Sequence, residues 1–369
     1  MAVGNQTKAQ RIPSLDGLRA VSITLVVLGH ALGHGTVSPA LRDFAPFFSG
    51  ELGVLIFFVI SGYLITTLLA DEIAKGDASL PRFYARRLVR LVPAQLAFVG
   101  TLFLLTQLTP LQMSACQFAT ALTYTKNYAC GAWVDGHLWS LSVEEQFYLL
   151  WPAALVFLPR RFAVGLAVLM LLLVAPGSRA VEYLVGHRAF FWLSSNADAL
   201  MMGCLAGLYC QSAPLTRLVF WRPALGRVAA ITLASIPVYL GSHLMLGAAN
   251  VLFGQTLQAL AAAYLVLSFT QVRRGWTYRF FNTRPVQALG VLSYSLYLWQ
   301  QLFVSTPTDL NGVSSPTLVF PLNVGAAFCM AVLSYRLIER PLLGVRRALA
   351  ADSLRKTAAP RSGEVFSDA

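Results

Sequence analysis

Long apolar stretches alternate with short polar segments along nearly the whole chain. A helix needs about 20 mostly apolar residues to cross a bilayer, and stretches suited to this recur from the N-terminal part to the C-terminal part. The predicted transmembrane helices cover residues 17–35, 50–70, 91–110, 138–158, 162–176, 189–210, 224–241, 249–270, 286–306 and 317–338. The pattern predicts an all-α polytopic membrane protein with about ten transmembrane helices and both termini on one side.

The polar segments between these helices carry an asymmetric charge. With the N-terminus in the cytoplasm, only four of the 28 Lys and Arg residues face outward: Arg42, Lys126, Arg179 and Arg188. Cytoplasmic segments are enriched in these residue types, so both termini are expected in the cytoplasm. A net charge of +12 is also typical of nucleic-acid binders. Here the basic residues punctuate apolar runs instead of forming a solvated face, so no nucleic-acid partner is expected.

Three segments are expected along the chain. Residues 1–14 form a polar cytoplasmic segment, residues 15–340 a transmembrane domain, and residues 341–369 a basic, disordered cytoplasmic tail. The composition is 56% hydrophobic and 12% charged, which lies far from soluble usage and makes the lipid bilayer a partner of the chain. The first apolar stretch is placed like a signal peptide, but its length and its ionisable residues favour a retained span.

The first predicted span, Leu15 to His34, contains two ionisable groups. Arg19 and His30 are eleven residues apart, about three helical turns, so both side chains share one face roughly 16 Å apart along the axis. Ionisable residues are costly in hydrocarbon, which favours an inward-facing, functional pair. The alternative is that Arg19 snorkels to the headgroups while His30 bonds a neighbouring helix.

A dense basic cluster, RFYARRLVRLVP, follows the second predicted span. Arg82, Arg86, Arg87 and Arg90 recur at spacings of three and four, so a short helix here would turn a guanidinium face toward the membrane surface. Contact with anionic lipids is one interpretation. The other is a soluble ligand with several phosphates, because arginine binds phosphate in a bidentate manner.

The fourth predicted helix opens with the sequence GHLWSLSVEEQFYLLWP. Ser140, Glu144 and Tyr148 follow one another at intervals of four and line one stripe, whereas Glu145 points about 100° away and is the weaker candidate. Carboxylates at this depth need a partner or a wet cavity. An interhelical ion pair that only sets packing is the alternative. Asp198 is a further intramembrane acid, beside a small residue, Gly203, that permits close helix contact.

Cysteine and histidine spacing gives two further expectations. Cys116 and Cys130 lie in an outer loop, where an oxidising compartment makes a disulfide plausible, with two free thiols as the alternative. His34 lies one turn beyond His30, and such a pair can bind a metal. No third ligand follows at a fixed spacing, so no metal is expected.

Six sequence blocks in one order resemble the signature of the acyltransferase-3 family of integral membrane O-acyltransferases. That family includes O-antigen, Nod-factor and macrolide acylating enzymes. The blocks are LDGLRA with Arg19 and His30, GVLIFFVISGYLI, RRLVRLVP, HLWSLSVEEQFYLLWP, LGVLSYSLYLW and IERP. The resemblance implies transfer of an acyl group, usually acetyl, from cytoplasmic acyl-CoA to a hydroxyl of a saccharide or glycolipid. It also implies the inner membrane of a bacterial-type cell.

The resemblance also implies site residues. Arg19 and His30 match the family's Arg-x10-His pair, Arg87 and Arg90 its Arg-x-x-Arg pair, and Glu144 the acid of its fourth-helix block. Some members append an extracytoplasmic hydrolase-like domain, and none is expected here.

Transfer from a thioester to an alcohol requires a base for the hydroxyl proton, and a neutral imidazole suits this task near pH 7. We expect His30 to be the general base and Glu144 to orient it or to bind the acceptor. The acyl-CoA phosphates are assigned to a set of arginines: Arg19, Arg86, Arg87 and Arg90. The acceptor or supporting residues are Ser140, Tyr148, His137 and Asp16. Direct transfer and a covalent relay both stay open.

A transporter of a lipid-linked glycan is the competing class, because it would also have many helices with buried ionisable groups. Two features count against it. The halves of the chain show no matching pair of Gly-broken or Pro-broken spans, and the ionisable groups crowd into the first four predicted helices.

Overall fold

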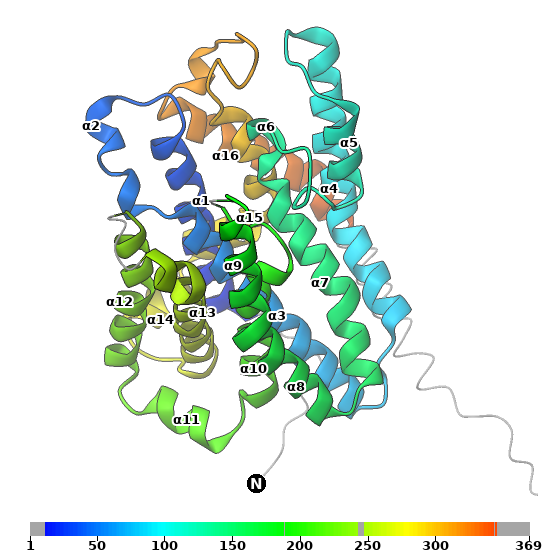
Figure 1. Ribbon diagram of the computed structural model, residues 1–369, viewed down its shortest axis with the longest axis vertical. Coiled ribbons are helices and arrows are strands. Elements are labelled where there is room, and N and C mark those ends of the chain that lie inside the picture. Colours follow the sequence, from blue (N-terminus) through cyan, green and yellow to red (C-terminus); the bar gives the residue numbers. More distant parts are fainter. Residues whose placement is uncertain (1–11, 188, 243–246, 343, 345–369) are drawn as a thin grey trace, which may run out of the picture.

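The computed structural model describes residues 12–187, 189–242, 247–342 and 344, which form a bundle of helices (Figure 1). These residues contain no β-strand, and one isolated bridge joins Thr36 to Val319. The elements are α1 (Pro13–Gly33), α2 (Pro39–Arg42), η1 (Ala45–Phe47), α3 (Gly50–Ala74), α4 (Leu80–Leu108), α5 (Ala115–Leu122), α6 (Trp133–Gly136), α7 (Leu138–Phe157), α8 (Arg160–Leu169), η2 (Met170–Val174), α9 (Ala175–Leu184), η3 (Ser194–Asn196), α10 (Ala197–Tyr209), α11 (Ala213–Phe220), α12 (Pro223–Ser242), α13 (Gly247–Gln271), α14 (Trp276–Phe281), α15 (Arg284–Phe303), η4 (Pro316–Leu318), α16 (Leu322–Ser334) and η5 (Tyr335–Glu339). The predicted all-α class is confirmed.

Six helical segments of the described chain are long and apolar enough to cross a membrane. They are Pro13–Gly33, Pro39–Ala74, Leu80–Leu108, Arg160–Leu184, Ala249–Gln271 and Leu322–Leu342. Helices α11 and α12, which meet at 94°, would provide a seventh span if taken together. The chain is therefore a multi-pass membrane protein. The count of ten spans and the side of the termini stay predictions, and most of the segments 1–14 and 341–369, together with Arg188, fall outside the described residues.

Helices α7 and α15 coincide with the predicted segments 138–158 and 286–306, yet they are not among the six. Both carry polar side chains inside an apolar run, including Glu144 on α7 and Gln300 on α15. A helix enclosed by other helices does not need a uniformly apolar surface, because its polar groups find partners in the protein.

The predicted boundaries fail most clearly at α4. This helix begins at Leu80, so the arginine-rich segment forms its first turns and is not a separate surface helix. Pro81 suits the first turn, where its missing N–H is not needed. Acidic partners of the arginines, described below, allow the helix to continue into the membrane. A second difference is at α10, which begins only at Ala197, after the irregular stretch 189–193 and η3.

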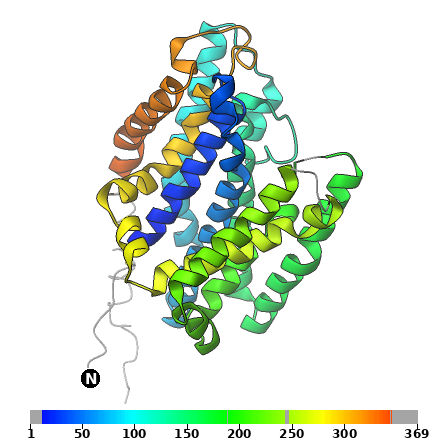
Figure 2. The same ribbon diagram turned by 90° about the vertical axis from the view of Figure 1, so that its left-hand side faces the viewer.

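Helices α1 and α3 lie at the centre of the bundle. The most apolar parts of these spans are 61% and 67% buried, against 33%, 28% and 22% for α4, the α8–α9 segment and α16. Figure 2 shows α1, in blue, running beside α15, in gold. Helices α4, α8–α9 and α16 therefore present more of their apolar side chains outward, as expected against lipid.

Small residues allow the central helices to approach closely. A Cβ atom on Gly62 of α3 would lie 2.1 Å from the carbonyl oxygen of Leu200, and one on Gly203 of α10 would lie 2.2 Å from that of Val59. The two glycines therefore make the α3–α10 crossing possible, as small residues commonly do in membrane proteins. The close contact predicted at Gly203 is confirmed.

Candidate active site

His30 lies in the last turn of α1, where its imidazole meets two other elements. Its Nδ1 is 3.1 Å from Oε1 of Gln300 on α15, and its ring stands edge-on to the indole of Trp133 on α6, with 5.4 Å between centroids. The imidazole is half-buried, whereas Gln300 is fully buried. The partner of the imidazole is therefore a neutral amide.

The start of α3 lies beside Nε2 of the imidazole. Ser49 caps this helix, because its side chain accepts a hydrogen bond from the backbone N–H of Leu52 at 3.1 Å. Gly50 then follows beside His30: a Cβ atom at this position would lie 3.5 Å from Nε2. The glycine leaves space next to that nitrogen.

Residues from two loops gather beside His30. His34, at the C-terminus of α1, stacks on Trp133 with 3.4 Å between ring centroids, and its Nε2 is 2.7 Å from Oδ2 of Asp309. Burial alone would raise the pKa of Asp309, but hydrogen bonds from Thr306 and His34 outweigh it, so this pKa lies below its ordinary value. Asp309 is therefore a charged anchor for His34.

His137 and Ser140 join the start of α7 to α15. The Nε2 atom of His137 is 3.0 Å from the carbonyl oxygen of Leu298, and the backbone N–H of His137 donates to Gln301 at 3.0 Å. The Ser140 hydroxyl is 2.5 Å from that of Tyr297, which donates to the carbonyl oxygen of His137. All these side chains are buried. The contacts hold the two helices together.

Glu144 lies deeper on the same face of α7, about 6 Å along the axis from Ser140 at 1.5 Å per residue. Its Oε1 accepts a hydrogen bond from Ser61 of α3 at 2.5 Å, and its carboxylate lies within electrostatic range of Tyr297. Among the described residues, no hydrogen bond joins Glu144 to His30. The amide of Gln300, and not this carboxylate, contacts Nδ1 of the imidazole.

Arg87 of α4 meets α7 one turn beyond Glu144. Its guanidinium lies over the ring of Tyr148, 3.4 Å from Cζ to the ring centroid, and its Nε is 3.4 Å from Oε1 of Glu145. The acid regarded as the weaker candidate therefore pairs with the predicted phosphate-binding arginine. Ser140, Glu144 and Tyr148 all contact other helices, so the predicted stripe faces the interior of the bundle.

The other arginines proposed for the donor also have acidic neighbours. Arg86 is 2.8 Å from Glu72 of α3. Arg82 is 2.9 Å from Asp77 and lowers the pKa of that carboxyl by hydrogen bonding to it. Arg90 lies within electrostatic range of Glu145 and Glu339, and Arg19 is 3.4 Å from Asp16 on its own helix. The basic cluster is thus largely neutralised by protein carboxylates.

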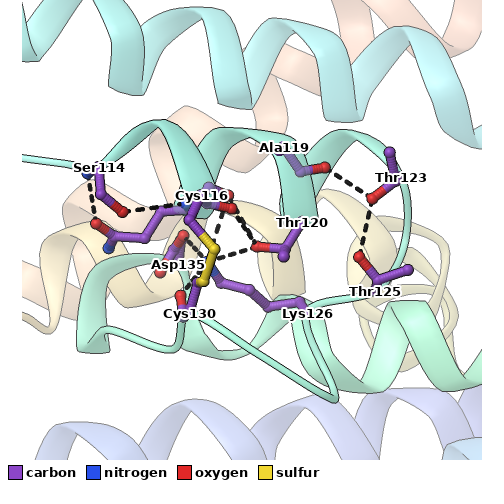
Figure 3. Close-up of a disulfide and its surroundings, with 10 residues drawn as sticks. Ser114, Cys116, Ala119, Thr120, Thr123, Thr125, Lys126, Cys130 and Asp135 are labelled. Atoms are coloured by element: carbon purple, nitrogen blue, oxygen red, sulfur yellow. Dashed lines mark hydrogen bonds and ion pairs between the residues drawn. A yellow bond between two sulfur atoms is a disulfide. The ribbon is translucent and has the colours of Figure 1, made fainter.

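A disulfide between Cys116 and Cys130 secures the loop that leads to Trp133. Lys126 forms a fully buried ion pair with Asp135 inside this loop, and its Nζ donates to the carbonyl oxygen of Cys130 at 2.8 Å (Figure 3). The disulfide closes residues 116–130, and the ion pair joins Lys126 of this loop to Asp135 of α6. Together they hold the short stretch before α6 in place. Trp133 is therefore fixed over the two histidines of α1.

The second half of the chain contains another buried polar cluster. Arg179 of α9 is fully buried and donates to Asp198 of α10 at 2.9 Å and to Thr256 of α13 at 3.0 Å. The predicted intramembrane acid thus has a cationic partner. Three helices are joined by these bonds, which is the packing role expected of a buried ion pair.

Sequence reasoning missed four contact residues: Gln300, Trp133, Ser61 and Tyr297. The polar pair Gln300 and Gln301 inside an apolar run was a usable signal, because polar side chains in a span need partners. Trp133 gave no signal, since its place depends on loop geometry. Within the described ranges, no group of three or more His, Cys, Asp or Glu side chains is arranged to hold a metal ion.

Comparison with known proteins places this site in a family. O-acetyltransferase OatA of Staphylococcus aureus is 28% identical over 362 residues, which cover 90% of this chain and 57% of that protein. Peptidoglycan O-acetyltransferase OatA of Listeria monocytogenes is 27% identical over 366 residues, covering 90% and 56%. The chain thus spans less than two thirds of the length of either relative. No solved structure matches it significantly.

A family model described as an acyltransferase domain matches residues 12–336. The matched range takes in α1 with His30, the arginine-bearing start of α4, the acid-bearing face of α7 and the glutamine pair of α15. The chain belongs to this acyltransferase domain family.

Proposed function

We propose that this chain is a membrane O-acetyltransferase that moves an acetyl group from cytoplasmic acyl-CoA to a hydroxyl of a cell-envelope saccharide. Family membership supports acyl transfer, and the names of both relatives support acetyl as the group. The name of the Listeria protein specifies peptidoglycan, so a peptidoglycan-type saccharide is the acceptor to test first. The proposed location is the inner membrane of a bacterial-type cell.

The placement of His30 carries this proposal. The imidazole is half-buried at the end of α1 that lies beside the disulfide-bonded loop, with one nitrogen on Gln300 and the other beside Gly50. The arginine-rich start of α4 follows the turn after α3, at the opposite end of the bundle (Figure 1). A base near one surface and cations near the other suit a reaction whose two substrates arrive from opposite sides.

The remaining side chains have distinct roles in the proposed reaction. Arg87 and Arg90, with Arg86 and Arg19, bind the donor phosphates, which displace carboxylates such as Glu145. Glu144 binds the acceptor from its position between the two ends. As the acceptor oxygen attacks the thioester carbon, its proton passes to His30, the C–S bond breaks, and the proton is returned to the CoA thiolate. We favour direct transfer because it needs fewer steps than a relay.

The test is acetyl transfer by purified protein in lipid nanodiscs, with radiolabelled acetyl-CoA and a peptidoglycan disaccharide. General-base catalysis is typically worth about 10²–10⁴-fold, so His30→Ala should lower turnover at least 100-fold while acetyl-CoA binding stays unchanged. His187→Ala is the matched control, because His187 is half-exposed and its side chain has only long contacts, with Glu182 at 3.8 Å and with the ring of Trp192 at 6.2 Å between centroids.

Transfer at the wild-type rate by a well-folded His30→Ala protein would contradict the proposed mechanism. Vesicles that contain the protein and the acceptor distinguish the enzyme from a transporter. Movement of the saccharide across the membrane without acetylation would identify an exporter instead.

A further inference from the structure

We propose that Gln300 is a positioning residue that holds His30 with its proton on Nδ1, so that Nε2, beside Gly50, is the nitrogen that takes the acceptor proton. This inference rests on the proposed function and specifies which atom acts as the base. It assigns to a neutral amide of α15 the role that the sequence suggested for Glu144.

The hydrogen bond between the two side chains fixes the direction of donation. The Oε1 atom of Gln300 faces Nδ1 of His30 at 3.1 Å, and an amide oxygen can only accept. Nδ1 must therefore carry the proton. A neutral imidazole has one N–H and one lone pair, so the lone pair is on Nε2.

Burial keeps Gln300 in contact with the imidazole. Gln300 is fully buried, and its Nε2 amide has no hydrogen-bond partner among the described residues. The one side-chain hydrogen bond described for Gln300 is therefore the contact with His30, which positions the imidazole.

The Nε2 side of the ring faces a residue without a side chain. A Cβ atom at Gly50 would lie 3.5 Å from Nε2 and 3.8 Å from the Cα of Val26, so the glycine leaves room there without being required for packing. The acceptor hydroxyl would approach Nε2 through this space. An alanine at this position would fill it and still fit the surrounding structure.

A neutral partner also keeps the imidazole available as a base. A carboxylate in place of Gln300 would favour the protonated ring, whereas an amide orients the ring without that effect. The other titratable groups near His30 are His34 on the same helix and His137 at the start of α7, and neither is an acid. The His34 ring faces Trp133 and Asp309. The amide is thus the only described hydrogen-bond partner that fixes the ring.

The experiment compares pH–rate profiles of variants at two adjacent glutamines. Gln300→Leu should lower turnover about 10- to 100-fold, part of the usual value of base catalysis, with unchanged acetyl-CoA binding. Gln300→Glu still accepts from Nδ1 but favours imidazolium, so its activity should persist and the acid limb of its profile should move up by about one pH unit. Gly50→Ala should lower turnover without loss of folded protein.

Gln301→Leu is the matched control, since Gln301 is the next residue, is also buried, and bonds the backbone N–H of His137. It should lower stability and leave the pH profile in place. Unchanged turnover in Gln300→Leu, or an unmoved acid limb in Gln300→Glu, would overturn the inference. If Gln300→Leu fails to fold, the profile of Gln300→Glu decides. An active His30→Ala protein would instead overturn the proposed function itself.

Discussion

At the scale of single residues, the arginines proposed to bind the donor are engaged by protein carboxylates. Arg87 pairs with Glu145 and lies over Tyr148, and Arg86 pairs with Glu72. Both arginines are mostly buried, with side chains 17% and 15% exposed. A phosphate that binds here has to replace these carboxylates or share the arginines with them. The affinity for the donor is therefore lower than free arginines would give.

Substitutions on the two sides of the Arg87 pair should therefore change donor binding in opposite directions. Arg87→Ala should weaken acetyl-CoA binding by tenfold or more, because it removes a charge-assisted hydrogen bond worth about 1.5–3 kcal/mol. Glu145→Gln should tighten binding several-fold at low salt, since it removes the competing carboxylate. Titration calorimetry with a non-hydrolysable acetyl-CoA analogue measures both.

Asp71→Asn is the control for this comparison. Asp71 is exposed and pairs with Lys75 at the C-terminal end of α3. The substitution therefore removes the same charge as Glu145→Gln without changing a partner of Arg87. Weaker donor binding in Glu145→Gln than in Asp71→Asn would show that the carboxylate does not compete with the donor.

At the scale of elements, the helix crossings depend on glycine. Gly62→Ala should destabilise the α3–α10 contact, because its Cβ would lie 2.1 Å from a backbone oxygen, which cannot move as a flexible side chain can. Overpacking of this kind costs about 1–3 kcal/mol, and a lower melting temperature in detergent, followed by size-exclusion chromatography, is the expected result.

Gly100→Ala, on the exposed side of α4, has no atom within 4 Å of the added Cβ and should leave the melting temperature unchanged or slightly higher. Equal melting temperatures for the two variants would mean that the crossing relaxes around the added methyl group.

Periodicity and length were sufficient to predict most elements. The ranges predicted for α7 and α15 match the structure within three residues, because each is a long apolar run bounded by polar residues. The start of α4 was mispredicted since a run of arginines signals a surface segment unless its acidic partners, more than ten residues away for Glu72 and Glu145, are known. Composition alone does not reveal such pairing.

The candidate site was predictable only where its residues lie on one helix. The shared face of Ser140, Glu144 and Tyr148 follows from helical spacing. The contact between His30 and Gln300 joins residues 270 positions apart, and nothing local in the sequence encodes it. Glu144 was assigned to the imidazole because a carboxylate is the usual partner of a catalytic histidine, whereas the fold brings an amide there.

At the scale of the whole molecule, the proposed reaction requires that the two ends of the bundle face different compartments. The predicted orientation places the turn after α3 in the cytoplasm and the loop between α15 and α16 outside. A membrane-impermeant thiol reagent applied to intact cells should therefore label Thr308→Cys and leave Lys75→Cys unlabelled. Both positions are exposed.

The labelling is made in a Cys329→Ser background, since this is the free cysteine with an exposed side chain among the described residues. Permeabilised cells provide the control, because both variants should then react. Labelling of Lys75→Cys in intact cells would reverse the orientation and with it the sides assigned to donor and acceptor.

The disulfide that secures the Trp133 loop sets an order of events in biogenesis. With the loop on the outer side, its covalent closure waits for export to an oxidising space, whereas the arginine end is complete as soon as the helices are inserted. Under the proposed function, a newly made molecule would therefore bind acyl-CoA before its acceptor side is complete. Maturation of the enzyme is then coupled to the redox state of the envelope, which the cytoplasm does not control.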